Sequence, residues 1–127
     1  MHRARFSLIV ASVGFAVFGV GMLLRPSLLA AVGIALTEPA AAVEIRAFYG
    51  GLEVGLAVFF GLAVGRPGWH RAALTAQIAV FAGAGLGRVF GLVVGGVLDP
   101  LLLLLLALEA AGAGLGLWAL RRAPGAP

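Results

Sequence analysis

The sequence predicts an all-α fold, a four-helix transmembrane bundle with a short interfacial helix between the first and second spans. Two properties of the 127-residue chain indicate this class. Hydrophobic residues make up 62% of the chain and charged residues 11%, with a mean hydropathy of +1.13, whereas a soluble domain carries about 25% charged residues. The apolar residues also form four runs, each close to the roughly 20 residues that cross a bilayer as a helix. These properties exclude an ordinary soluble domain and a disordered chain.

The four runs define the expected spans of one integral membrane domain that covers residues 1–127. Lipid cannot satisfy backbone N–H and C=O groups, so each run is predicted to be helical despite its glycines. Strands of a barrel are the poorer alternative, because the runs do not alternate apolar with polar residues. The predicted spans are Phe6–Leu24, Val43–Gly65, Ala72–Val97 and Leu101–Leu120.

Prolines next to charged residues mark the ends of the runs. Pro26 follows the first run, Pro67 follows the second, and Pro100 precedes the fourth. The apolar stretch Ser27–Leu36 is too short to span, so it is predicted to form a short helix at the membrane surface. A cleavable signal peptide is the alternative for the first run. That run is longer than a usual signal core and lacks a small-x-small cleavage site before Arg25.

The arginines predict the orientation of the spans. The chain has nine arginines, no lysine and a net charge of +4. With the amino terminus inside, six arginines lie on the cytoplasmic side and only Arg25 lies in the outer loops, as the positive-inside rule requires. We therefore expect a multi-pass inner-membrane protein with cytoplasmic amino and carboxyl termini. We therefore interpret the positive charge as a determinant of topology and of contact with anionic lipid head groups. Nucleic-acid binding has little support. The six cytoplasmic arginines are Arg3, Arg5, Arg66, Arg71, Arg121 and Arg122.

A regular spacing of glycines predicts close helix packing in the third span. Gly83, Gly87, Gly91 and Gly95 recur every four residues and form three overlapping GxxxG units. In lipid, small residues let helix backbones approach closely and so supply the energy of association. The partner of this glycine stripe is either another helix of the same chain or a second copy in a homodimer.

Ionisable residues inside the spans are the best indication of a site, because each costs a few kcal/mol to insert. At ~1.5 Å rise per residue along each predicted span, Glu53 and Glu109 are expected within about 2 Å of the membrane midplane. Arg88 is expected about 6 Å from the midplane, toward the outer side. On the second span Arg46, Tyr49 and Glu53 share one helix face, which predicts a polar stripe descending from the outer interface. These five side chains are the predicted pocket for a ligand or an ion.

The predicted pocket has two interpretations. In the first, Arg88 pairs with one of the two deep carboxylates, and the other is left to bind a ligand or exchange a proton. In the second, Arg88 shares its guanidinium between Glu53 and Glu109, and the network fixes the helix register. Glu44 and Asp99 are placed at the outer mouth of the pocket.

Several kinds of chemistry find no support in the sequence. The absence of cysteine removes disulfides, thiolate metal sites and a cysteine nucleophile. His2 and His70 fall in the cytoplasmic tail and loop, out of reach of the polar pocket, so histidine-ligated haem or metal is not expected. His70 is predicted to be an interfacial residue. No catalytic residue, metal ligand or cofactor is predicted.

Three motifs contain the charged residues of the later spans: Glu44-Ile-Arg-Ala-Phe-Tyr-Gly-Gly-Leu-Glu53, Gly85-Leu-Gly-Arg-Val-Phe-Gly91 and Leu106-Ala-Leu-Glu109. On these motifs the chain is similar to a known family. The chain resembles a family of small bacterial four-span membrane proteins known only as a domain of unknown function. More distantly, it resembles the DoxX-like group of four-helix membrane proteins. The resemblance implies a four-helix integral membrane fold over nearly the whole chain and no particular activity.

Three functions are compatible with these sequence features. The leading hypothesis is a non-enzymatic membrane module that binds a small amphipathic ligand, such as a lipid or a quinone, or that supports a membrane complex. The second is a small proton-coupled cation transporter that acts as a dimer, with Glu53 or Glu109 exchanging a proton for the cation. The third is a membrane-embedded enzyme with acid-base chemistry at the two carboxylates, for which the sequence identifies no substrate.

Overall fold

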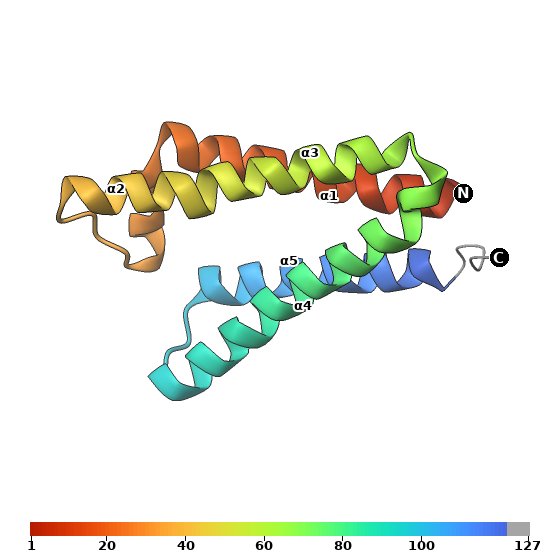
Figure 1. Cartoon of the computed structure of the whole chain (residues 1–127). Coiled ribbons are helices and arrows are strands. Elements are labelled where there is room, and N and C mark those ends of the chain that lie inside the picture. Colours follow the sequence, from red (N-terminus) through yellow and green to blue (C-terminus); the bar gives the residue numbers. More distant parts are fainter. Residues whose placement is uncertain (122–127) are drawn as a thin grey trace. The chain divides into compact units, whose positions relative to one another are not determined.

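The computed structural model describes residues 1–121, and within this range the chain contains helices and no strands. The all-α prediction is therefore confirmed. A 3₁₀ helix, η1, lies between the first and second long helices (Figure 1). A π-helical segment, η2, lies inside the second long helix. The predicted Arg122 lies outside the described residues. In chain order the elements are α1 His2–Leu24, η1 Pro26–Val32, α2 Pro39–Ile45, η2 Arg46–Gly51, α3 Leu52–Val64, η3 Pro67–Trp69, α4 His70–Gly95 and α5 Pro100–Leu120.

Within residues 1–121, four helical stretches are long and apolar enough to cross a membrane, as predicted. Their ends differ from the predicted ends by a few residues. The second stretch begins at Pro39 rather than Val43, because proline fits the first turn of a helix, where its missing N–H costs nothing. Helix α4 stops at Gly95 because Gly96 adopts a left-handed backbone with φ +61°. The N–H of Gly96 donates a hydrogen bond to the carbonyl of Leu92.

The short helix between the first two spans is confirmed, with different bounds and a tighter turn. It is the 3₁₀ helix η1, seven residues long, rather than a helix over Ser27–Leu36. Pro26 begins it, and Gly33 ends it with a φ of +82°, a conformation that favours glycine. The N–H of Gly33 is donated to the carbonyl of Ala30, which closes the last turn.

The chain divides into two compact units, and each is described by itself. Unit 1 holds the start of α1, through Leu8, and the chain from Ala63 onward; unit 2 holds residues 9–62. In unit 1, α4 and α5 form an antiparallel pair (Figure 1). Its tightest contacts involve glycines of α5. A Cβ at Gly112 would lie 2.7 Å from the ring of Phe81, and one at Gly116 would lie 2.9 Å from Ile78. Such close approach is typical of helices packed in lipid.

In unit 2, α1 packs antiparallel against η2 and α3. Ser12 Oγ donates a hydrogen bond of 2.8 Å to the carbonyl of Ala57, and the rings of Phe15 and Phe60 lie 5.6 Å apart. Nearer the other end of this contact, a Cβ on Gly19 would lie 2.9 Å from the backbone of the facing helix. Glycine is required there because no larger residue fits without moving one helix away from the other.

Candidate functional site

Arg88 and Glu109 form an ion pair between α4 and α5 in unit 1. Nε of Arg88 donates to Oε2 of Glu109 at 2.9 Å, and Nη2 donates to Oε1 at 2.5 Å. This two-point geometry uses the planar fork of arginine and gives strong, charge-assisted hydrogen bonds. The side chain of Arg88 is 26% exposed and that of Glu109 is 12% exposed. The pairing of Arg88 with one deep carboxylate, which one interpretation of the sequence required, is thus present.

Gly85 of α4 lies against the glutamate of this ion pair. Gly85 lies one turn before Arg88 on α4, and a Cβ added there would lie 3.6 Å from Cβ of Glu109 and 3.8 Å from its Oε2. A long side chain at this position would enter the space that the carboxylate occupies. The backbone of α4 thereby approaches the carboxylate closely, and Arg88 reaches the same carboxylate from the next turn.

A second polar contact in unit 1 joins three helices and was missed at the level of sequence. Gln77 of α4 is 1% exposed and Ser7 of α1 is 0% exposed. Ser7 Oγ donates to Oε1 of Gln77 at 3.0 Å, and Nε2 of Gln77 donates to the carbonyl of Gly112 at 3.0 Å. The amide thus uses both its donor and its acceptor, which a buried polar side chain needs. The sequence holds only a weak signal for it, an isolated glutamine inside an apolar run.

In unit 2, Arg46, Gly50 and Glu53 all lie against α1. Nε of Arg46 donates to the carbonyl of Leu23 at 3.0 Å, so this arginine satisfies a carbonyl at the end of α1. A Cβ at Gly50 would lie 2.7 Å from Leu23, and one at Gly19 would lie 2.9 Å from Cβ of Glu53. Within residues 9–62, no hydrogen bond or ion pair engages the Glu53 carboxyl group.

A π-helical turn lies within this part of the second span. Residues 46–51 adopt π-helical hydrogen bonding, and the N–H of Leu52 is donated to the carbonyl of Ala47, five residues earlier. The wider turn makes the angular spacing of Arg46, Tyr49 and Glu53 differ from that of a regular α-helix. Single π turns inside α-helices are frequent at functional sites. Tyr49 belongs to this turn and is 40% exposed.

Glu44, Asp99 and His70, the other residues discussed from the sequence, lie in different parts of the structure. Glu44 is exposed on α2. Asp99, placed at the outer mouth, caps α5: its Oδ1 accepts the backbone N–H groups of Leu101 and Leu102 at 2.8 and 3.1 Å. His70 begins α4 and is 6% exposed, with Nε2 3.5 Å from the carbonyl of Val64.

The glycine stripe of α4 contacts little within its own unit. A Cβ on Gly83, Gly87 or Gly91 would meet no atom within 4 Å, and one on Gly95 would lie 3.7 Å from Val97. The packing role of this stripe, within the chain or in a homodimer, stays a prediction. The glycine of α4 that does pack against α5 is Gly85, outside the four-residue register.

The five side chains predicted to form one pocket belong to two units. Arg88 and Glu109 are paired in unit 1, whereas Arg46, Tyr49 and Glu53 follow one another along η2 and the start of α3 in unit 2. Among residues 1–121, no group of three or more His, Asp or Glu side chains gathers as a metal-binding set. The chemistry available is that of an arginine–glutamate ion pair in unit 1, and of a tyrosine hydroxyl and a carboxyl group in unit 2.

Four helices of spanning length with charged side chains inside them define a multi-pass helical membrane protein. Residues 3–120 match the model of a family described as a domain of unknown function (DUF4345), and the chain belongs to this family. The predicted resemblance to a domain-of-unknown-function family is thus confirmed, while the DoxX-like relation stays a prediction. No curated protein and no solved structure matches the chain.

Proposed function

We propose that the protein is a non-enzymatic module of a bacterial inner membrane that binds a small amphipathic ligand, such as a lipid or a quinone, through Glu53. The observation that carries the proposal is the state of this carboxyl group. It belongs to an apolar span, yet within unit 2 it has no hydrogen bond or ion pair. Glu109, by contrast, uses both oxygens on Arg88. An ionisable group within a span usually has a partner, and an amphipathic ligand with a polar head supplies one.

The neighbours of Glu53 suit such a ligand. Tyr49 lies one turn earlier, is 40% exposed and offers a hydroxyl group next to an aromatic surface. Leu52, next to Glu53 in the chain, is 54% exposed, so apolar surface lies beside this residue. A polar head bound by Glu53 and Tyr49, with its apolar part along α3, would satisfy both kinds of surface.

Co-purification tests this proposal. The wild-type chain is extracted in a mild detergent, and the bound lipids and quinones are identified by mass spectrometry. We expect one amphipathic species to be enriched and to fall at least severalfold in Glu53→Gln. Glu38→Gln is the matched control, because it removes the same charge from an exposed residue just before the same span. Equal enrichment in Glu53→Gln and the wild type, or no enriched species at all, would contradict the proposal.

The carboxyl group of Glu53 also favours a second candidate, a proton-coupled cation transporter acting as a dimer. Because Glu109 is paired with Arg88, the exchange of proton for cation is assigned to Glu53. The candidate predicts uptake of a cation into proteoliposomes that is driven by a pH gradient and lost in Glu53→Gln. Uptake that persists in this variant removes the candidate.

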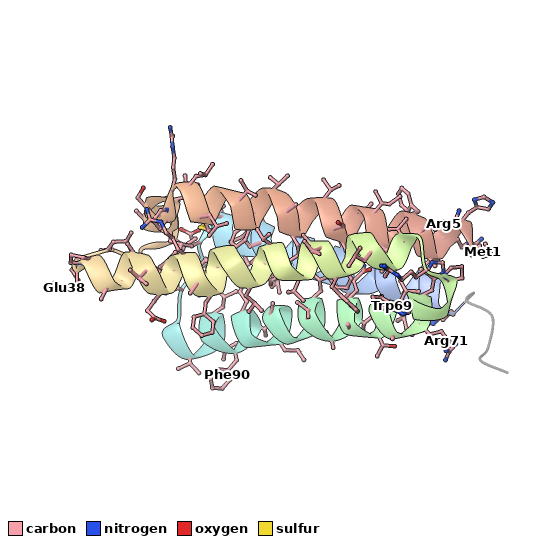
Figure 2. The ribbon with its side chains drawn as sticks, turned by 45° about the horizontal axis from the view of Figure 1, so that its top comes forward. Met1, Arg5, Glu38, Trp69, Arg71 and Phe90 are labelled. Carbon is pink, nitrogen blue, oxygen red and sulfur yellow. The ribbon has the colours of Figure 1, made fainter. Side chains whose placement is uncertain are left out.

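The proposed orientation, with both termini in the cytoplasm, rests on the arginines. Figure 2 shows Met1, Arg5, Trp69 and Arg71 at one end of unit 1, and Phe90 at its other end. A basic end of this kind stays in the cytoplasm. Because the chain has no cysteine, single cysteines can be introduced without background. An impermeant maleimide applied to whole cells should label Glu38→Cys and leave Gly68→Cys unlabelled; the opposite pattern would reverse the orientation.

A further inference from the structure

A surface cavity of about 250 Å³ lies in unit 1, where α1 begins and α5 ends. Arg3 of α1 lines it together with Gly114, Leu117 and Trp118 of α5 and with Arg121, which follows α5. Two arginines from opposite ends of the described chain therefore line one small cavity. We propose that this Arg3–Arg121 cavity binds the phosphate group of an anionic phospholipid.

The charge of the cavity is not neutralised within the described part of unit 1. The two acidic side chains in the described part of unit 1 have other partners: Asp99 caps α5, and Glu109 pairs with Arg88. Along α5, Glu109 lies twelve residues before Arg121, a separation of about 18 Å at 1.5 Å per residue. Two arginines held close together without a carboxylate attract an anion, and a phosphate group matches the fork of guanidinium donors.

Arg3 is held in a position that suits a phosphate. Its guanidinium carbon lies 4.6 Å from the centre of the Trp118 ring, within the range of a cation–π contact. A guanidinium stacked on a ring still has N–H donors at its edge for an oxygen atom. Trp118 thus fixes the cation without neutralising it.

Free phosphate and a lipid phosphate share the same chemistry, and the walls of the cavity favour the lipid. Leu117 and Trp118 are 40% and 44% exposed and belong to the end of an apolar helix of spanning length. A Cβ at Gly114 would meet no atom within 4 Å, so there is open space one turn from Trp118. Tryptophan and arginine gather at the depth of the lipid head groups, and basic pockets between spanning helices bind anionic ones.

Fluorescence quenching in vesicles tests the proposal. The chain has two tryptophans, so Trp69→Phe leaves Trp118 as the reporter. The full chain is placed in phosphatidylcholine vesicles that contain brominated phosphatidylglycerol or brominated phosphatidylcholine, and the ratio of the two quenching efficiencies is measured. Each arginine near an anionic lipid strengthens binding about fivefold. We therefore expect phosphatidylglycerol to be preferred and the preference to fall about fivefold in Arg3→Gln and in Arg121→Gln.

Three controls make the outcome decisive. Arg25→Gln removes the same charge from unit 2 and should keep the preference. Gly114→Leu fills the open space and should reduce the preference without any change of charge. Inorganic phosphate at constant ionic strength should not compete with the lipid. Equal quenching by the two lipids, an unchanged preference in both cavity arginine variants, an equal loss in Arg25→Gln, or displacement by inorganic phosphate would each overturn the assignment.

This site is independent of the proposed function at Glu53. An anionic lipid that stays bound in Glu53→Gln and is lost in Arg3→Gln supports the cavity and leaves the function of Glu53 to its own test. The reverse result supports Glu53 and overturns the cavity.

Discussion

Removal of one partner of the Arg88–Glu109 ion pair is expected to destabilise unit 1 by about 3 kcal/mol. The pair makes two hydrogen bonds, of 2.9 and 2.5 Å, and its side chains are 26% and 12% exposed. Breaking a buried pair costs about 3–5 kcal/mol, because the remaining charge is left without compensation. Since Arg88 keeps a quarter of its exposure, the lower end of this range applies. The equilibrium constant for unfolding should then rise about 150-fold.

The measurement is a double-mutant cycle in reversible unfolding, carried out with denaturant in detergent–lipid micelles. The single variants are Glu109→Gln and Arg88→Met, and the double variant is Arg88→Met with Glu109→Leu. The double variant replaces the pair with apolar side chains, a change that is often neutral or stabilising. Single variants within about 0.5 kcal/mol of the wild type would refute the reasoning, as would a double variant as unstable as the sum of the singles.

Three further substitutions test the close packing of the helices. Gly19→Ala should destabilise the protein by about 1–3 kcal/mol, since its Cβ would lie 2.9 Å from the backbone of the facing helix. Gly14→Ala, on the same helix, has open space around its Cβ and should not destabilise the protein. Equal losses of stability in thermal unfolding of the two variants would contradict this reasoning. Gly112→Ala should also lower the melting temperature, because its Cβ would lie 2.7 Å from a phenylalanine ring, whereas Gly114→Ala should not; identical melting temperatures would reject the contact. Gln77→Leu should cost about 1–2 kcal/mol by leaving a carbonyl and a hydroxyl without their partner, visible as faster hydrogen exchange near Gly112, and unchanged exchange would count against it.

Composition determines most of this fold in advance. A chain with 11% charged residues cannot cover four long helices with a polar surface, so the number and type of the long elements follow from hydropathy alone. The ends of the helices are less predictable, because they depend on backbone conformation. Gly96 stops α4 by adopting a positive φ, and nothing in an apolar run that contains many glycines indicates which of them will do so.

The candidate site could be predicted only in part. The pairing of Arg88 with a deep carboxylate follows from the cost of a lone charge in a span, and the sequence limits the partner to Glu53 or Glu109. The contact between Ser7 and Gln77 could not be found in this way. It joins residues 70 positions apart, and each of them is too weakly polar to be unusual inside an apolar run.

Helix geometry explains why spacing rules are weak guides to packing here. At 3.6 residues per turn, each step of four residues rotates a glycine by about 40°, so four of them spread over about 120° of the helix surface. Such a stripe is too wide to serve as one line of contact. The contacts between α4 and α5 instead place large side chains of α4, such as Phe81, against Gly112 of α5. The π turn of η2 also alters which residues share a helix face, since its hydrogen bonds span five residues rather than four.

The acidic residues within the spans and next to them differ in what their carboxylate oxygens contact, and this difference distinguishes structural from functional roles. Asp99 caps a helix and Glu109 holds an arginine, so replacing either should change stability first. Glu53 packs through its Cβ near Gly19, a contact that glutamine keeps, while its carboxyl group has no partner within its own unit. Glu53→Gln should therefore leave unfolding nearly unchanged in ligand-free protein and alter binding, whereas Glu109→Gln should do the reverse. If both variants lose stability equally, Glu53 also has a structural role, and the argument for a ligand at this residue loses its basis.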